Sequence, residues 1–300
     1  MEKYYLSNEK KTVWYEWNEV SKPTGIIQIA HGMVEYACRY DNIAKKLNEA
    51  GFIVAADDHR GHGATDRDNL GYCKGDMFFD TAEDMKLLTD TVKNKYPGLP
   101  YILFGFSYGS FLTQYYIGKY MNGLNGVIIG GSSKQKKLMV AAGRAVAGLG
   151  CIFKGEKREA QLIKKLTFGS YDKKFEDGVF LSTDKKNNER YFSDPLCSFV
   201  CSNNFYRSFF KGLSSLYGKK YKNGLNKDVP VLIISGKDDP VGDMGSGPLR
   251  LFEFYKKCGL KNVELKLYEN SRHEFLNEAE GPERLNDIIA FCRKCLDNKV

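Results

Sequence analysis

Apolar and polar positions follow two alternating patterns after residue 25. Short apolar runs of four to six residues are each followed by a longer stretch in which apolar residues recur every three or four positions. The short runs predict strands, at Ile26–Ala30, Phe52–Ala56, Tyr101–Phe104, Gly126–Ile129, Val231–Ile234 and Val263–Tyr268. Short apolar strands separated by helices are typical of a mostly parallel sheet with helices on both faces, so the sequence predicts an α/β fold.

The longer stretches predict amphipathic helices between these strands. They lie at Tyr40–Ala50, Thr81–Tyr96, Ser110–Met121, Leu249–Cys258 and Glu283–Cys295. Gly51 and Pro97 follow the first two helices, as expected at helix ends. Before the first parallel strand, two short runs around Asn8-Glu9-Lys10 predict a hairpin, formed by Tyr4–Leu6 and Val13–Trp17.

Residues 134–225 interrupt this alternation. Their pattern is helical, basic and aromatic, without the strand–helix repeat. Doubly wound folds bind ligands at the carboxyl ends of their strands, and an insertion between two strands can cover that edge. We therefore predict two units: a core of residues 1–133 and 226–300, and a helical cap of residues 134–225.

The charge distribution sets the predicted cap apart from the core. The whole chain carries a net charge of +8, but residues 134–225 hold 19 Lys and Arg against 8 Asp and Glu. The remaining residues hold 26 against 29. This asymmetry indicates an anionic partner for the cap, such as a membrane surface or an acidic substrate. Nucleic acid is not expected, because no recognised binding module is present.

The composition of the chain and the lengths of its apolar runs predict its cellular location. The chain is 42% hydrophobic, as expected for a folded globular protein. The residues Met1–Trp17 contain no apolar core of a signal peptide, and the longest apolar run, Leu138–Phe153, contains Arg144 and is too short for a membrane span. These features predict a cytoplasmic protein, with peripheral membrane contact as an option.

Eight cysteines include one C-x-x-C motif, Cys292 and Cys295. Such a motif can bind zinc or act in redox chemistry, but no second pair of ligands has suitable spacing. On the last helix the motif belongs to one apolar stripe, formed by Leu285, Ile288, Ile289, Cys292, Cys295 and Leu296. We therefore predict buried, reduced thiols, and neither a metal nor a cofactor.

The strongest chemical signal is the pentapeptide Gly105-Phe106-Ser107-Tyr108-Gly109. It is a G-x-S-x-G motif between a predicted strand and a predicted helix, the setting in which this motif presents a nucleophilic serine. The helix that follows would favour developing negative charge at its first amides. The sequence therefore predicts Ser107 as a nucleophile.

A serine hydroxyl needs a base to accept its proton. The α/β-hydrolase order is serine, then an acid, then histidine, and only His273 of the four histidines follows Ser107. The acid should follow strand Val231–Ile234, where Asp238 and Asp239 compete. Asp239 precedes a proline that favours an extended backbone, so we prefer Asp239 and keep Asp238 as the alternative.

Two backbone amides should stabilise the oxyanion of the tetrahedral intermediate. One is expected from Tyr108, directly after the nucleophile. The other is expected from the loop His31-Gly32-Met33-Val34-Glu35, and we choose Met33. His31 is expected to shape this loop rather than to act as a base.

Several motifs in order carry a family resemblance: His31-Gly32-x-x-Glu35, Arg39-Tyr40, Asp58-His59-x-Gly61-His62-Gly63, Tyr96-Pro97-Gly98-Leu99-Pro100, Gly105-x-Ser107-x-Gly109, Gly236-x-x-Asp239 and the His273 loop. The chain resembles the monoacylglycerol lipase and bacterial lysophospholipase group of α/β hydrolases, in the serine aminopeptidase-like branch. The resemblance covers residues 25–133 and 229–278. It is weak in the predicted cap, where only Ser193-Asp194-Pro195-Leu196 is similar.

The resemblance implies the α/β-hydrolase fold, a triad of Ser107, Asp239 and His273, and oxyanion amides at Met33 and Tyr108. It also implies structural roles for His59 and His62. Tyr108 and Tyr36 depart from the residues common in the family, and both are expected to line the substrate pocket.

We therefore expect a serine hydrolase that cleaves carboxylic esters of lipids, such as a monoacylglycerol or a lysophospholipid, through an acyl-enzyme on Ser107. The alternatives are another carboxylesterase, an aminopeptidase of the same branch, or a non-catalytic binding protein on this fold. Lysines flank the apolar run Leu138–Phe153 on both sides. This run is expected to dock on anionic lipid, to act as a lid packed on the pocket, or both.

Overall fold

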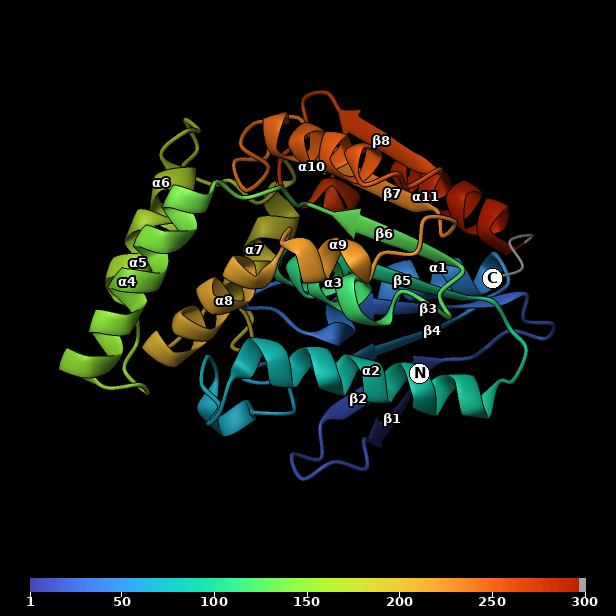
Figure 1. Ribbon diagram of the computed structural model, residues 1–300, viewed down its shortest axis with the longest axis horizontal. Helices are drawn as coiled ribbons and strands as arrows, with labels where there is room; N and C mark the ends of the chain where they lie inside the picture. The colour runs from blue at the N-terminus through green and yellow to red at the C-terminus, as the bar shows by residue number, and fades with distance from the viewer. Residues whose placement is uncertain (297–300) are drawn as a thin grey trace.

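The computed structural model describes residues 1–296 and contains one eight-stranded sheet with helices on both faces (Figure 1). The strand order is β1-β2-β4-β3-β5-β6-β7-β8. The strands are β1 Glu2–Tyr5, β2 Val13–Trp17, β3 Gly25–Ala30, β4 Phe52–Asp57, β5 Tyr101–Phe106, β6 Gly126–Gly130, β7 Val231–Gly236 and β8 Val263–Tyr268. The last six are parallel, whereas β1 and β2 form an antiparallel hairpin that pairs with β4. The predicted α/β-hydrolase fold class is confirmed.

The helices outside residues 134–225 divide between the two faces of the sheet. One face packs against α1 and α11, and the other against α2, α3 and α10. Their bounds are α1 Asp41–Glu49, α2 Met77–Lys95, α3 Tyr108–Tyr120, α10 Ser246–Lys257 and α11 Gly281–Leu296, with 3₁₀ turns at Ala37–Tyr40, Arg67–Asn69 and Phe275–Asn277. Strands β3 to β7 are buried along their whole length, because helices cover both of their faces.

Helix α2 begins four residues before the predicted start at Thr81. The amide of Phe78, in the first turn, donates to Ser208 Oγ of α8 at 2.8 Å. First-turn amides lack partners within their own helix, so a distant serine supplies the acceptor here. That acceptor lies 130 residues away in the sequence and leaves no local signal.

Residues 134–225 leave the sheet after β6 and return to it before β7, and we call them the helical segment. It contains α4 Lys137–Lys154, α5 Gln161–Leu166, α6 Phe168–Asp172, α7 Lys185–Ser193, α8 Asn203–Ser215 and α9 Lys219–Asn223. In Figure 1, α4 to α8 lie at the end of the molecule toward which the parallel strands point. Helix α8 connects the segment to the core, because it packs against α2, α3 and α4.

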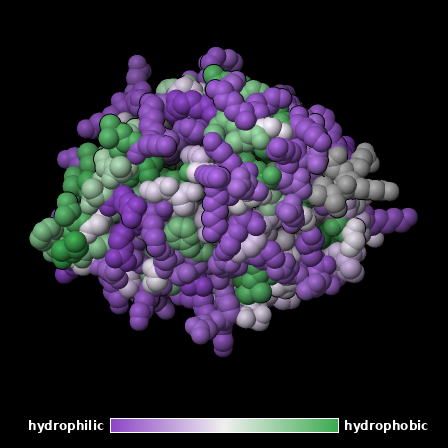
Figure 2. Space-filling model, viewed as in Figure 1, coloured by the Kyte–Doolittle hydropathy of each residue, from purple (hydrophilic) through white to green (hydrophobic). Residues whose placement is uncertain are grey.

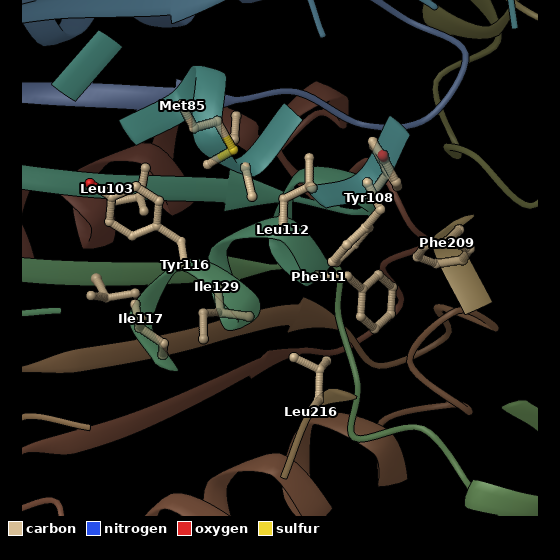
Figure 3. Close-up of a cluster of buried hydrophobic side chains, with 14 of the residues drawn as sticks. Met85, Leu103, Tyr108, Phe111, Leu112, Tyr116, Ile117, Ile129, Phe209 and Leu216 are labelled. Atoms are coloured by element: carbon tan, nitrogen blue, oxygen red, sulfur yellow. The ribbon is translucent and has the colours of Figure 1, made fainter. Parts of the chain in front are cut away.

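The sheet has a hydrophobic core on each face, and helix α3 lies at the centre of the larger one, on the face covered by α2, α3 and α10. Nine of its thirteen residues are buried, since it lies between the sheet, α2 and α8. Figure 3 shows Tyr108 and Phe111 at one end of this helix beside Phe209 of α8, and Tyr116 farther along it. The helix that follows the predicted nucleophile is therefore fixed on several sides.

The C-terminal cysteines lie where the apolar stripe predicts. Cys292 and Cys295 are fully buried and unpaired, and a Cβ placed on Gly126 of β6 would lie 2.5 Å from Cys295 Sγ. Burial raises the pKa of the Cys292 thiol well above its usual value. These thiols act as packed apolar groups, as predicted.

We expect the double variant Cys292→Ala, Cys295→Ala to lose about 1 kcal/mol or more of unfolding free energy per thiol, because each removed sulfur leaves a gap in the core. Urea unfolding measures this loss, and half-buried Cys258→Ala is the control with the smaller loss. Specific activity should stay unchanged with and without reductant. Reductant-dependent activity that disappears in the double variant would contradict the packing role.

Candidate active site

Ser107 occupies the sharp turn between β5 and α3. Its backbone has φ 52° and ψ −118°, in a region that a residue with a side chain adopts only when its surroundings enforce it. The two glycines of the motif make the turn possible. A Cβ on Gly109 would lie 2.0 Å from the carbonyl oxygen of Ala30, and one on Gly105 would lie 2.4 Å from that of Gly109. Neighbouring backbone therefore fills both positions.

The structure brings Ser107, His273 and Asp239 into one hydrogen-bonded line. His273, in the loop after β8, has Nε2 at 2.9 Å from Ser107 Oγ and Nδ1 at 2.9 Å from Asp239 Oδ2. Asp239, after β7, is fully buried and also accepts from the amide of Val241 and the hydroxyl of Ser235. The structure places Asp239, rather than Asp238, beside the imidazole. Carboxylate, imidazole and hydroxyl have the geometry of an activated nucleophile.

The surroundings of His273 set its basicity. Burial by itself lowers the pKa of His273, but the negative charge and the hydrogen bond of Asp239 outweigh burial and raise that pKa above its usual value. An imidazole with a raised pKa accepts a proton more readily. The carboxylate also fixes the ring so that Nε2 faces the serine hydroxyl.

Met33 and Tyr108 both line the cavity at Ser107. Met33 belongs to the loop of residues 31–35, whose shape is held by Glu35: its carboxylate accepts from the amide of Gly32 at 2.6 Å and from the hydroxyl of Tyr40 at 2.9 Å. Val34 has a positive φ of 56° within this loop. The two residues predicted to supply oxyanion amides thus flank the nucleophile from separate elements.

His31 also helps to hold this loop in shape, as predicted. Its Nδ1 faces the carbonyl of Gly32 at 2.7 Å, and its Nε2 accepts from the amide of His59 at 3.0 Å. The rings of His31 and His59 stack at 3.9 Å between centroids. Burial lowers the pKa values of His31, His59 and His62, so these rings are neutral and structural.

Arg39, whose role its sequence motif did not reveal, joins the loop of residues 31–35 to the loop that carries His273. Arg39 donates to both carboxylate oxygens of Glu274, at 2.9 and 3.1 Å, and to Glu35 Oε2 at 2.5 Å. Glu274 directly follows His273. Burial opposes ionisation of Glu274, but the Arg39 guanidinium and several hydrogen bonds hold its pKa at about 2. The motif showed Glu35 and Arg39 as neighbours, whereas Glu274 lies 235 residues from Arg39.

The helical segment also holds both loops of the site. The carbonyl of Leu181 accepts from the amide of Glu274 at 2.6 Å, and the amide of Ser198 donates to the carbonyl of Val34 at 3.1 Å. Asn187 of α7 donates to Glu274 Oε2 at 2.6 Å. The loops that carry His273 and Met33 therefore depend on residues of the segment for their conformation.

Tyr36 does not lie where it was expected. Its hydroxyl donates to Asp194 Oδ2 at 2.7 Å, and the residue is not among those that line the cavity. The prediction that Tyr36 lines the pocket is wrong, because this hydrogen bond directs the side chain to the helical segment. Tyr108 does line the cavity, and its ring packs against Phe205 and Phe209 of α8. Figure 3 shows Tyr108 and Phe209 side by side.

The cavity above Ser107 has a volume of about 400 Å³ and lies between the core and the helical segment. Most of its lining is apolar or aromatic, including Met139, Val140, Val146, Phe111, Phe209, Phe210 and Leu213. Its polar lining includes Ser107, His273, Glu35 and Glu274 on the core side, and Gln135, Lys164, Thr167, Asp172 and Ser198 on the side of the helical segment. Within residues 1–296 no group of three His, Cys, Asp or Glu side chains is arranged to hold a metal ion. The site can therefore enclose a long apolar group and present its reactive end to Ser107.

A mostly parallel sheet with a serine on a strand–turn–helix and a histidine and an aspartate on later loops defines an α/β hydrolase. The family model described as serine aminopeptidase, S33, matches residues 21–280. The chain belongs to this family. The family resemblance and the enzyme class predicted from the sequence, a serine ester hydrolase, are both confirmed.

Similar proteins cover nearly the whole chain. A monoacylglycerol lipase from Mycolicibacterium smegmatis is 25% identical over 281 residues, which span 94% of this chain and 92% of that protein. A human monoglyceride lipase is 24% identical over 281 residues, which span 91% of this chain and 82% of that protein. The crystal structure of a highly thermostable carboxyl esterase from Bacillus coagulans has a TM-score of 0.89 at 28% identity and covers 98% of both chains.

We expect Asp239→Asn to lower kcat by about 10³- to 10⁴-fold, because an amide neither orients nor stabilises the imidazolium as a carboxylate does. The negative charge of Asp239 raises the pKa of His273, so its loss should move the acidic limb of the kcat/KM profile to lower pH. A pH–rate profile measures both effects. Asp238→Asn is the matched control, with activity expected within about twofold, and a larger loss in that control would contradict the assignment of Asp239.

Proposed function

We propose that this protein hydrolyses long-chain carboxylic esters of lipids through an acyl-enzyme on Ser107. The observation that carries the proposal is the hydrogen-bonded line of Ser107, His273 and Asp239 at the wall of an apolar cavity. The helical segment acts as a cap in this proposal, since α4 and α8 form much of the wall opposite the nucleophile.

In the first half-reaction, His273 Nε2 takes the proton of the Ser107 hydroxyl as the oxygen attacks the ester carbonyl. The carbonyl oxygen becomes an oxyanion, which the amides of Met33 and Tyr108 stabilise. Asp239 stabilises the imidazolium. Collapse of the tetrahedral intermediate breaks the ester bond, and His273 gives its proton to the departing alcohol.

In the second half-reaction, His273 takes a proton from a water molecule that attacks the acyl-enzyme. A second tetrahedral intermediate forms in the same oxyanion hole. Its collapse returns the proton to Ser107 and releases the fatty acid. Neither half-reaction requires a metal or a cofactor.

The cavity favours an acyl chain over a peptide. An aminopeptidase must hold the ammonium group of its substrate with a carboxylate near the scissile bond. Two carboxylates beside the nucleophile, Glu35 and Glu274, are already bound to Arg39. Asp172 also lines the cavity and accepts from the amide of Phe180 at 3.1 Å. The apolar lining and the relatives named monoacylglycerol and monoglyceride lipase support a lipid ester instead.

We expect Ser107→Ala to lower kcat by about 10⁴-fold or more with an unchanged fold, because the triad residues act as a unit. The measurement is a panel of monoacylglycerols and lysophospholipids of graded chain length, with product analysis, beside an aminoacyl nitroanilide. A fluorophosphonate probe should label the native protein and not the variant. Preference for the nitroanilide, or labelling that persists in Ser107→Ala, would contradict the proposal.

The outer face of the helical segment adds a lipid-facing surface to the proposal. Leu138, Ile152 and Phe153 at the two ends of α4 are 83%, 75% and 79% exposed, and Leu162 and Leu166 of α5 are exposed beside them. In Figure 2, hydrophobic atoms gather at the left edge of the molecule, where Figure 1 places α4 and α5. No helix within residues 1–296 is long and apolar enough to cross a membrane.

Lysines lie at the ends of α4 and on α5, next to these exposed apolar residues. Lys137 and Lys154 lie at the two ends of α4, Lys157 follows in the next turn, and Lys165 lies between the exposed leucines of α5. Apolar residues with lysines at their edges are typical of shallow insertion into an anionic lipid surface. We propose that the segment docks there and delivers lipid to the cavity beneath it.

Docking of this kind should depend on the lysines. Each one near an anionic surface is worth about 1 kcal/mol, so the triple variant Lys137→Gln, Lys154→Gln, Lys157→Gln should bind anionic vesicles roughly a hundredfold more weakly. Sedimentation with vesicles of rising anionic fraction measures this, and added salt should also weaken binding.

The matched control removes three exposed lysines from the opposite end of the strands, by Lys256→Gln, Lys257→Gln and Lys261→Gln. This variant should bind vesicles as the native protein does. Equal binding to neutral and anionic vesicles, or an equal loss in both triple variants, would contradict docking through the helical segment.

A further inference from the structure

Three fully buried polar side chains lie close to the nucleophile, and none of them lines the cavity. Ser110 and Gln114 of α3 and Ser132, which follows β6, have no exposed surface. Buried polar groups weaken a core unless each one is hydrogen-bonded. Each of these side chains therefore needs a hydrogen-bond partner within the core.

These side chains form one continuous path from the helical segment to Ser107. Tyr217, in the turn between α8 and α9, donates its hydroxyl to Gln114 Oε1 at 2.5 Å. Gln114 Nε2 donates to Ser132 Oγ at 2.9 Å. The hydroxyl of Ser110 lies 2.6 Å from Ser132 Oγ and 2.5 Å from the carbonyl oxygen of Ser107.

Counting protons gives the path a direction. A carbonyl oxygen only accepts, so the single hydroxyl proton of Ser110 must point to Ser107. Ser132 then donates its own proton to Ser110 Oγ, because its other contact is the amide nitrogen of Gln114, a donor. Each side chain along the path then donates one proton in the direction of the Ser107 carbonyl. Hydrogen bonds aligned in this way strengthen one another.

The end of the path lies in the peptide unit that also contains a proposed oxyanion donor. The carbonyl of Ser107 and the amide N–H of Tyr108 belong to one planar peptide group, in which they point in opposite directions. A hydrogen bond that holds the carbonyl oxygen therefore fixes the direction of the N–H. The first-turn amides of Ser110 and Phe111 also donate to this carbonyl, at 2.9 and 3.3 Å. The hydroxyl of Ser110 adds a third and shorter hydrogen bond, next to the strained backbone of Ser107.

We propose that Ser132 and Tyr217 are positioning residues that hold the Tyr108 amide in the oxyanion hole through Ser110 and Gln114. The proposal rests on the function proposed above. In this proposal the buried path helps to stabilise the oxyanion, which develops in the transition state and is absent from the bound ester.

The position of Tyr217 ties this arrangement to the helical segment. Its φ is 68°, and its ring is fixed by Tyr221, Phe254 and the Lys134 ammonium, which lies 5.3 Å above it. Lys134 begins the segment, and Tyr217 lies in the turn that brings it back to the core. The first residue of the segment and its turn between α8 and α9 thus meet at Tyr217, the residue with which the path begins.

The test compares Tyr217→Phe and Ser132→Ala with a matched tyrosine variant. Removing an oxyanion donor outright costs about 10²- to 10³-fold in kcat, so loosening one should cost less. We expect about a 3- to 10-fold loss of kcat for Tyr217→Phe and about a 10- to 100-fold loss for Ser132→Ala, with KM within about twofold. The substrate is p-nitrophenyl butyrate. Because both half-reactions use the oxyanion hole, kcat should fall whichever of them limits the rate.

Tyr116→Phe is the control. Tyr116 lies on the same helix, is buried, and donates its hydroxyl to Thr89 Oγ1 at 2.9 Å, away from Ser107. It should lose a similar amount of stability in urea unfolding and keep its kcat. A trifluoromethyl ketone, which forms an anionic tetrahedral adduct with the nucleophile, should bind Tyr217→Phe more weakly and Tyr116→Phe normally.

The possible outcomes distinguish failure of the positioning role from failure of the proposed function. If Ser107→Ala stays active, the proposed function is wrong. If Ser107→Ala is inactive while Tyr217→Phe and Tyr116→Phe have the same kcat, only the positioning role is wrong. A raised KM with unchanged kcat in Tyr217→Phe would also overturn it, because such a change reports substrate binding. Tyr217→Phe keeps the test decisive if Ser132→Ala does not fold.

Discussion

The rest of the structure depends on the strained turn that carries Ser107. A residue with a side chain adopts φ 52° there only because neighbouring groups leave it no other conformation. Gly105 and Gly109 let the backbone of β3 and α3 approach within distances that no Cβ would allow, and the amide of Ser107 donates to the carbonyl of Gly130. This turn also fixes where β5 ends and where α3 begins. Helix α3 then has to be buried on nearly every side, which is why the sheet, α2 and α8 converge on it.

Three loops meet at this turn: those that carry Met33, Asp239 and His273. Ion pairs, rather than apolar contacts, join the Met33 loop to the His273 loop. Arg39 bridges Glu35, which shapes the loop of Met33, and Glu274, which follows His273. Buried carboxylates are unfavourable without such a partner, so this arrangement couples the two loops strongly. The carbonyl of Leu181 and the amide of Ser198 complete the connection from the helical segment. The segment is thus part of the framework of the site as well as the wall of its cavity.

The helical segment presents apolar surface on two sides. Its inner side lines the cavity with Met139, Val140 and Phe210, while its outer side exposes Leu138, Ile152 and Phe153. A core helix needs one apolar face, so the second face is not required for folding. The proposed long-chain ester would have to pass from a lipid phase to the cavity, and a segment that is apolar on both sides suits that path. This common chemistry links the proposed substrate to the proposed surface.

Local pattern determined the strand–helix order, the position of the nucleophile turn and the apolar stripe of α11. These features depend on neighbours within a few residues, and hydrophobic periodicity and glycine placement record such neighbours directly. The order of motifs along the chain also singled out Ser107 and His273 and left Asp238 and Asp239 as candidates for the acid, of which the proline after Asp239 favoured Asp239. The structure then places both Ser107 and Asp239 within hydrogen-bond distance of His273. Only the tertiary structure decided the early start of α2, the direction of Tyr36, the partner of Arg39 and the path from Tyr217 to the Ser107 carbonyl. Each depends on a hydrogen bond between residues far apart in sequence, with 103 residues separating Tyr217 from Gln114. A polar side chain shows in the sequence that it needs a partner, but folding alone selects which partner it meets.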